Sequence, residues 1–109
     1  MSVTLGEFEL LVLLACLRLG DKEAYAVGIA DDIAARTGRS MQRAAVYVTL
    51  QRLEKKGLIT THLGDPRPER GGKARRLVYV EQAGREAVRD ARQALQRMWG
   101  GLGAQLEAL

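Results

Sequence analysis

Residues 7–19 form the longest apolar stretch of the chain, and after Glu7 only Glu9 and Arg18 interrupt it. A helix that has no polar face is buried on several sides, either in a core or between subunits. Gly20 follows directly and is a typical C-terminal cap. The pattern therefore predicts a buried helix over residues 7–19 that ends at Gly20.

Two further helices are predicted in the first half of the chain. One covers about residues 23–37 and ends at Gly38, because its apolar positions recur at the helical spacing of four. Those positions are Tyr25, Ile29 and Ile33. The other covers about residues 41–56, and Ser40 is its candidate N-cap because a hydroxyl there can accept an unpaired backbone N–H.

The helix over residues 41–56 has two distinct faces. Its core stripe consists of Val46, Leu50 and Leu53. The adjoining outward arc spans about 100° of the helix. It carries Arg43, Ala44, Tyr47 and Gln51. Arg, Gln and Tyr can reach base edges and phosphates, and Ala lets a backbone approach closely.

The pattern changes after Gly57. Residues 58–63 and 77–80 are short and rich in β-branched residues, so both are predicted to be strands. The stretch GDPRPERGGKARR between them predicts a hairpin with a long cationic tip. From Gln82 the pattern is helical again to near the C-terminus. Three helices, a hairpin and a long helix predict a mostly α chain with a small β-hairpin wing, the winged helix-turn-helix plan.

The last helix carries an apolar stripe at positions a and d of a seven-residue repeat, which is typical of the seam between two helices. The stripe consists of Val88, Ala91, Leu95, Met98, Leu102 and Leu109, with Gln105 breaking the series. Gly100, Gly101 and Gly103 each cost about 1 kcal/mol of helix stability relative to Ala. We therefore expect residues 1–81 to bind DNA and residues 82–109 to dimerise within one compact unit, with a bend after Trp99.

Charge is unevenly distributed along the 109 residues. Residues 1–38 carry a net charge of −3, residues 39–76 carry +7, and the remainder is balanced, which gives +4 for the chain. A cationic middle third attracts polyanions, so nucleic acid is the first candidate partner. A solvated basic face remains the alternative.

The sequence lacks the residues that several classes of function require. One Cys (Cys16) and one His (His62) cannot make a disulfide framework or a Cys/His zinc site, and we expect no metal and no cofactor. The apolar run over residues 10–17 is far shorter than the ~20 residues that cross a bilayer, and residues 1–8 carry Glu7 and no Lys or Arg, so we expect no signal peptide there. We expect a soluble cytoplasmic protein that binds no membrane and is not an enzyme, since neither a Ser/His/Asp set nor a phosphate-binding Gly loop is found.

Several motifs together resemble the PadR family of bacterial transcriptional regulators, from Leu5 to about Met98. They are LGEFELLVLLACLRLG, AYAVGIADDIAARTGR, AAVYVTLQRLEKKGLI, DPRPERGGKARR and EQAGREAV. The resemblance implies a winged-helix homodimer, usually a repressor, that binds an inverted repeat in a promoter. It also implies that the last helix makes most of the dimer contact and the first helix helps. Gln42, Ala44 and Glu81 depart from the family pattern, which commonly has Ser, Gly and Thr there.

The expected DNA-binding residues lie in the third helix, just before it, and in the hairpin. They are Ser40, Gln42, Arg43, Ala44, Tyr47, Gln51, Arg67, Arg70, Lys73, Arg75 and Arg76. The matching family position favours a phosphate contact for the Tyr47 hydroxyl, although its ring could instead pack against the wing. Arg43 and the hairpin cations could instead be ordinary surface residues.

The expected dimer interface consists of Leu10, Leu14, Val88, Ala91, Leu95, Met98, Trp99 and Leu102. Some members of the family stack planar cationic compounds on a Trp of the last helix, and that position matches Leu95, one turn before Trp99. Trp99 is therefore either a dimer anchor or, with Leu95, part of a site for a planar aromatic effector. A protein-interaction module on the same fold is a third hypothesis, which would not need a basic wing.

Overall fold

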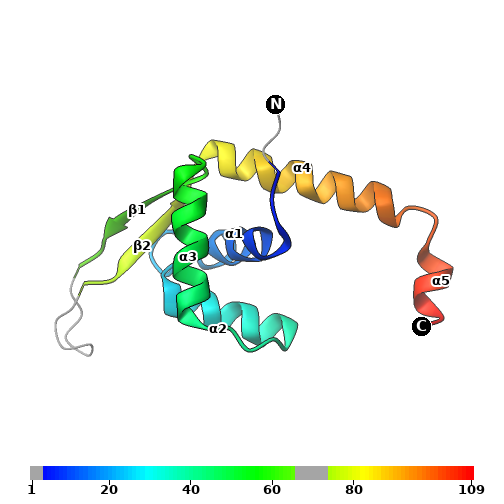
Figure 1. The fold of residues 1–109 in the computed structure, drawn as a ribbon, viewed down its shortest axis with the longest axis horizontal. Helices are drawn as coiled ribbons and strands as arrows, with labels where there is room; N and C mark the ends of the chain where they lie inside the picture. Colours follow the sequence, from blue (N-terminus) through cyan, green and yellow to red (C-terminus); the bar gives the residue numbers. More distant parts are fainter. Residues whose placement is uncertain (1–3, 66–73) are drawn as a thin grey trace.

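The computed structural model describes residues 4–65 and 74–109. Within these ranges the chain is mostly helical with one antiparallel hairpin, as predicted (Figure 1). The elements in order are α1 (Glu7–Leu19), α2 (Ala26–Thr37), α3 (Arg43–Lys55), β1 (Ile59–Leu63), β2 (Arg76–Val80), α4 (Gln82–Trp99) and α5 (Gly103–Glu107).

Helix α1 lies at the centre of the core. Val12, Leu13, Ala15 and Cys16 are buried, and α1 contacts α2, α3, α4 and β2. The predicted burial of residues 7–19 on several sides is confirmed. Gly20 ends α1 with a φ of 80°, the left-handed conformation that glycine adopts most easily.

Helix α2 begins later than its apolar spacing suggested. Residues 21–23 form a turn, and the Ala24 carbonyl accepts a hydrogen bond of 2.8 Å from the Val78 N–H of β2. Tyr25 is the extended N-cap residue. The predicted start near residue 23 is therefore wrong, because the chain pairs with β2 before it turns into the helix.

Helix α3 is not capped by Ser40. Its N-cap is Gln42, which is extended and makes no side-chain cap bond. Ser40 lies two residues earlier, beyond the usual reach of an N-cap side chain to the N–H groups of the first turn. The core stripe was predicted correctly: Val46, Leu50 and Leu53 are buried.

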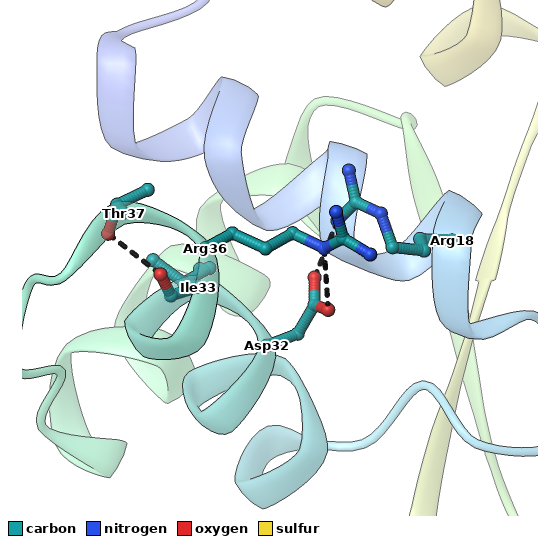
Figure 2. A network of polar contacts seen from close by, with 5 residues as sticks. All are labelled: Arg18, Asp32, Ile33, Arg36 and Thr37. Atoms are coloured by element: carbon teal, nitrogen blue, oxygen red, sulfur yellow. Dashed lines mark hydrogen bonds and ion pairs between the residues drawn. The ribbon is translucent and has the colours of Figure 1, made fainter.

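An ion-pair network joins α1 to α2 on the surface of the core (Figure 2). The Asp32 carboxylate accepts hydrogen bonds from Arg18 Nη1 at 2.6 Å and from Arg36 Nε at 3.2 Å. One turn farther along, the Thr37 hydroxyl donates to the Ile33 carbonyl at 2.7 Å. Arg18, one of the two polar interruptions in the apolar run, thus anchors the end of α1 to α2.

The first turn of α1 holds both ends of α3. Glu7 pairs with Arg39, in the segment before α3, at 2.7 Å. Glu9 pairs with Lys56, the C-cap residue of α3, at 2.7 Å, and it also accepts the Gly6 N–H at 2.9 Å. These contacts fix how α3 lies against α1.

The hairpin joins the core along one face. Strands β1 and β2 pair in the register Ile59↔Val80, Thr61↔Val78 and Leu63↔Arg76. Ile59, Val78 and Val80 are buried, whereas Arg76 is exposed. Helix α3 contacts β1, so the hairpin lies beside α3.

The last helix is shorter than predicted. Helix α4 ends at Trp99, Gly101 has a φ of 82°, and the chain continues as the short α5 (Figure 1). The predicted bend after Trp99 is confirmed, but the single seam through Leu102 and Leu109 is wrong. The glycines break the helix, so Leu102 becomes the N-cap residue of α5.

Gly84 lets α4 pack closely on the hairpin. A Cβ at this buried position would lie 2.3 Å from the Leu58 carbonyl oxygen and 2.9 Å from Val80 Cγ1. A backbone oxygen cannot move aside as the end of a flexible side chain can. We expect Gly84→Ala to lower the free energy of unfolding by about 1–3 kcal/mol, measured by urea denaturation. Gly103→Ala is the control, because a Cβ there meets nothing within 4 Å. Equal stability of the two variants would contradict the close approach.

Glu9 should make stability depend on pH. Burial opposes its ionisation, but the hydrogen bonds from Lys56 and Gly6 prevail, so the pKa of Glu9 lies below its ordinary value of 4.5. A folded pKa below the unfolded one means that the stabilisation is complete above about 4.5 and is lost as pH falls through the folded pKa. We expect the native chain to be more stable than Glu9→Gln at pH 7 and the difference to shrink in acid. Urea unfolding at a series of pH values measures it, with Glu7→Gln as the exposed control. A gap that stays constant with pH would refute this assignment.

Candidate nucleic-acid interface

The exposed side of α3 carries the residues predicted to face outward. Arg43, Ala44, Tyr47 and Gln51 are all exposed. On the opposite side, Thr49 is buried with the core stripe, and its hydroxyl donates to the Ala45 carbonyl at 2.9 Å. The buried polar group is satisfied within the helix, so α3 can pack its inner side fully while presenting donors and cations outward.

Tyr47 and Gln51 share a depression with the hairpin. This depression, of about 330 Å³, lies between α3 and the strands, and Arg76 and Thr61 line its other wall. Tyr47 is 53% exposed, so its ring borders the hairpin and its surface still reaches solvent. Both earlier interpretations of Tyr47 are compatible with this place.

A chain of hydrogen bonds directs Arg76. Its Nη1 donates to the Thr61 hydroxyl at 2.9 Å, and that hydroxyl donates to Glu54 at 3.2 Å. Glu54 lies in the last turn of α3, so these hydrogen bonds link the end of α3 to both strands. Arg76 stays exposed while its guanidinium is oriented.

Arg75 lies in a different environment from Arg76. Its guanidinium carbon stands 4.3 Å from the centre of the Tyr25 ring, and Nη1 lies 3.5 Å from the Glu23 carboxylate. The side chain is only 10% exposed. Arg75 therefore packs the residue before β2 against the start of α2, and it lines a pocket together with Tyr25 and Tyr47.

The remaining predicted DNA-binding residues fall into two groups. Ser40 and Gln42 are exposed in the segment just before α3. Arg67, Arg70 and Lys73 lie outside the described residues. Sequence reasoning also missed Val48, which is 46% exposed on α3. Its helical spacing, four residues after Ala44, was the signal that could have placed it on the outer side.

The predicted dimer residues form a strip that runs from the core to the exposed end of α4. Val88 packs against the core and Ala91 is half-buried. Beyond them, Leu95, Met98 and Trp99 are 40%, 75% and 57% exposed. Leu10 and Leu14 of α1 are half-buried, and Leu102 is half-buried after the break.

A groove of about 450 Å³ separates the first turn of α1 from α4. Its apolar lining includes Leu5, Leu10, Ala91 and Leu95, and Glu7 and Asp90 add two carboxylates. Trp99 lies one helical turn beyond Leu95 on α4. Of the two residues predicted for an effector site, Leu95 thus borders this groove.

Other kinds of site have little support in the part of the chain that the structure describes. No group of three or more His, Cys, Asp and Glu there could hold a metal ion, and no helix there is long and apolar enough to cross a membrane. Cys16 is buried, and burial raises the pKa of its thiol to about 12. Cys16 therefore behaves as a small apolar residue and not as a nucleophile.

Known proteins share both the sequence pattern and the fold. The model of the transcriptional regulator PadR-like family matches residues 13–90. The chain is similar to a PadR family transcription regulator from hypervirulent Clostridium difficile, with 20% identity, a TM-score of 0.73 and coverage of 93% of this chain and 99% of the other. A search of curated proteins found no significant match.

Two further solved structures resemble the fold. A PadR family transcriptional regulator from Eggerthella lenta has 23% identity and a TM-score of 0.67 over 91% of this chain and 83% of the other. A PadR-like transcriptional regulator from Bacillus cereus has 17% identity and a TM-score of 0.65 over 91% and 89%. At these identities the structures establish the winged-helix fold, and the family match over most of the chain shows that it belongs to the PadR-like family of transcriptional regulators.

Proposed function

We propose that the protein is a dimeric repressor that acts in the cytoplasm and binds an inverted repeat in a promoter. Helix α3 enters the major groove, whose width accommodates a helix, and the hairpin lies along the backbone. A dimer bound there blocks transcription by occupying the promoter. A reporter gene driven by the DNA upstream of the protein's own coding region tests repression, because deleting the protein should raise its expression.

The single observation that carries DNA binding is the shared place of Tyr47, Gln51 and Arg76. They line one depression although they come from α3 and β2, and the middle third of the chain carries a net charge of +7. A helix presented together with the Arg76 guanidinium of β2 fits a groove and the phosphates beside it. A protein-interaction module would not need this charge.

Each exposed residue then takes a role that suits its chemistry. Arg43 and Gln51 read base edges, and Tyr47 and Arg76 contact phosphates. Ala44 lets the α3 backbone approach the DNA groove. Ser40 and Gln42 lie where the DNA backbone would pass the start of α3. Arg75 holds the outer end of β2 against the start of α2, because its guanidinium is engaged by Tyr25 and Glu23. The cations of the hairpin tip, Arg67, Arg70 and Lys73, are proposed as further phosphate or minor-groove contacts from sequence alone.

A second copy of the chain is the proposed cover for the exposed end of α4. Leu95, Met98 and Trp99 leave an apolar strip in water on a single chain, which favours burial against another apolar surface. Two-fold pairing through this strip, helped by Leu10 and Leu14, would place two α3 helices about 34 Å apart, one turn of DNA.

A second candidate function, the response to an effector, is favoured by the groove between α1 and α4. The groove is mainly apolar, and Glu7 and Asp90 would attract a cation. A planar aromatic cation lying against Leu95 fits this lining, and Trp99 is close enough along α4 to report it by fluorescence. Saturable quenching together with weaker DNA binding would support this function.

DNA binding should be strongly salt-dependent. If each subunit neutralises about four or five phosphates, the log–log salt slope of a dimer is about −7 to −9. Arg76→Ala removes one proposed phosphate contact per subunit and should flatten the slope by about two, measured by fluorescence anisotropy at several salt concentrations.

Arg43→Ala should instead relax the preference at one base pair per half-site by about 1–3 kcal/mol. Arg89→Ala, exposed on α4, is the control. A slope near zero would reject DNA binding through this surface and favour a protein-interaction module.

The dimer should dissociate when charges enter the strip on α4. Leu95→Asp with Met98→Asp places two carboxylates per subunit in an apolar interface, where unpaired charge is costly. Sedimentation should then show monomers, and specific DNA affinity should fall because the half-sites no longer bind together. Gln93→Asp adds a carboxylate to the side of α4 away from the strip and should leave the dimer intact. A Leu95/Met98 variant that still sediments as a dimer would place the interface elsewhere.

A further inference from the structure

Val48 occupies the centre of the outer side of α3. The buried side of the helix is formed by Val46, Thr49, Leu50 and Leu53. At about 100° per residue, the direction opposite this stripe passes between Ala44, Val48, Gln51 and Lys55. Tyr47 and Arg43 lie toward the flanks of this surface. Val48 is therefore one of the side chains placed to meet the floor of a groove, and sequence reasoning had left it out.

Val48 differs in chemistry from the side chains around it. It is 46% exposed, and the shallow depression that it lines is otherwise formed by Gln51, Arg52, Glu54 and Lys55. A β-branched residue is also a poorer helix former than the straight-chain residues common on helix surfaces. Neither burial nor helix propensity accounts for a valine here, and its polar surroundings do not suit an apolar protein partner.

The DNA major groove offers one apolar group. Base edges there present hydrogen-bond donors and acceptors, and the exception is the C5-methyl group of thymine. Arg52 and Lys55 are exposed on the same side of α3 as Val48 and would lie toward the phosphates. An apolar side chain at the centre of a cationic helix surface thus suits a thymine methyl at the bottom of the groove.

We infer that Val48 is a specificity-determining residue that reads a thymine methyl group in each half-site. The inference rests on the proposed entry of α3 into the major groove. It adds a sequence preference that none of the polar contacts supplies. The contact buries one methyl group per half-site, so its contribution is small but confined to one base pair.

Uracil provides the test, because it is thymine without the C5-methyl group. A preferred DNA site is first selected from a random duplex library, and each symmetry-related pair of thymines is then replaced by uracil. At one position we expect the native protein to lose about fourfold in affinity per half-site. Val48→Ala should bind the thymine and uracil sites equally, and Val48→Ile should keep the preference for thymine.

Matched variants separate this contact from other effects. Lys55→Ala should weaken binding to the thymine and uracil sites alike, since a phosphate contact does not sense the methyl group. Thermal unfolding should show that Val48→Ala is as stable as the native chain, since the side chain lies on the surface. The comparison of protein and DNA changes is a double-mutant cycle, so sequence-independent effects cancel.

The outcomes distinguish this inference from the proposed function. If the library yields a preferred site but uracil costs the same for the native chain and Val48→Ala, the inference about Val48 is wrong and DNA recognition stands. If uracil costs nothing at any position, the inference is equally refuted. If no site is enriched over random DNA, the proposed function itself fails, and the inference with it.

Discussion

The structure depends on the burial of α1 on several sides. Its apolar surface has no face that water can cover cheaply, so α2, α3, α4 and β2 must all pack against it. Val12 and Leu13 are fully buried as a result. Because α3, β2 and α4 all pack against the same helix, the positions of these elements depend on one another. If one of these elements packs differently on α1, the surface on which the other elements pack changes too.

The polar residues of α1 complete this arrangement. Arg18 pairs with Asp32 of α2, Glu9 pairs with Lys56 after α3, and Glu7 pairs with Arg39 before α3. Apolar packing is non-directional and tolerates sliding, whereas an ion pair with hydrogen-bond geometry selects one register. The polar interruptions in an otherwise apolar helix therefore lie where they can orient its neighbours. The exposed Glu7 pair contributes little stability, and the less exposed Glu9 pair contributes more.

The sequence pattern correctly predicted the features that depend on neighbouring residues, namely helix faces and helix ends. Helical spacing identified the core stripe of α3, glycine identified the ends of α1 and α2, and three glycines predicted the break after Trp99. Tertiary contacts decided the rest. The hydrogen bond from Val78 to the Ala24 carbonyl keeps residue 24 out of α2, so the helix begins later than predicted. Arg75 was predicted only as one of the hairpin cations, but its side chain contacts Tyr25 and Glu23. The outward arc was centred too near Tyr47, although the direction opposite Val46, Leu50 and Leu53 already passes beside Val48, which is exposed.

The first turn of α1 is in contact with both the segments that flank α3 and the groove proposed to bind an effector. Glu7 lines the groove beside α4 and also pairs with Arg39, and Leu10 lines the same groove one turn along α1. Glu9, two residues after Glu7, holds the other end of α3 through Lys56. An effector changes DNA affinity only if it binds two arrangements of the protein with different affinity. A ligand cation that competed with Arg39 for Glu7 would release only an exposed ion pair to the segment before α3, and such a pair contributes little stability. The difference in affinity would therefore have to come mainly from how Leu10 of α1 and Leu95 of α4 pack around the ligand in the groove.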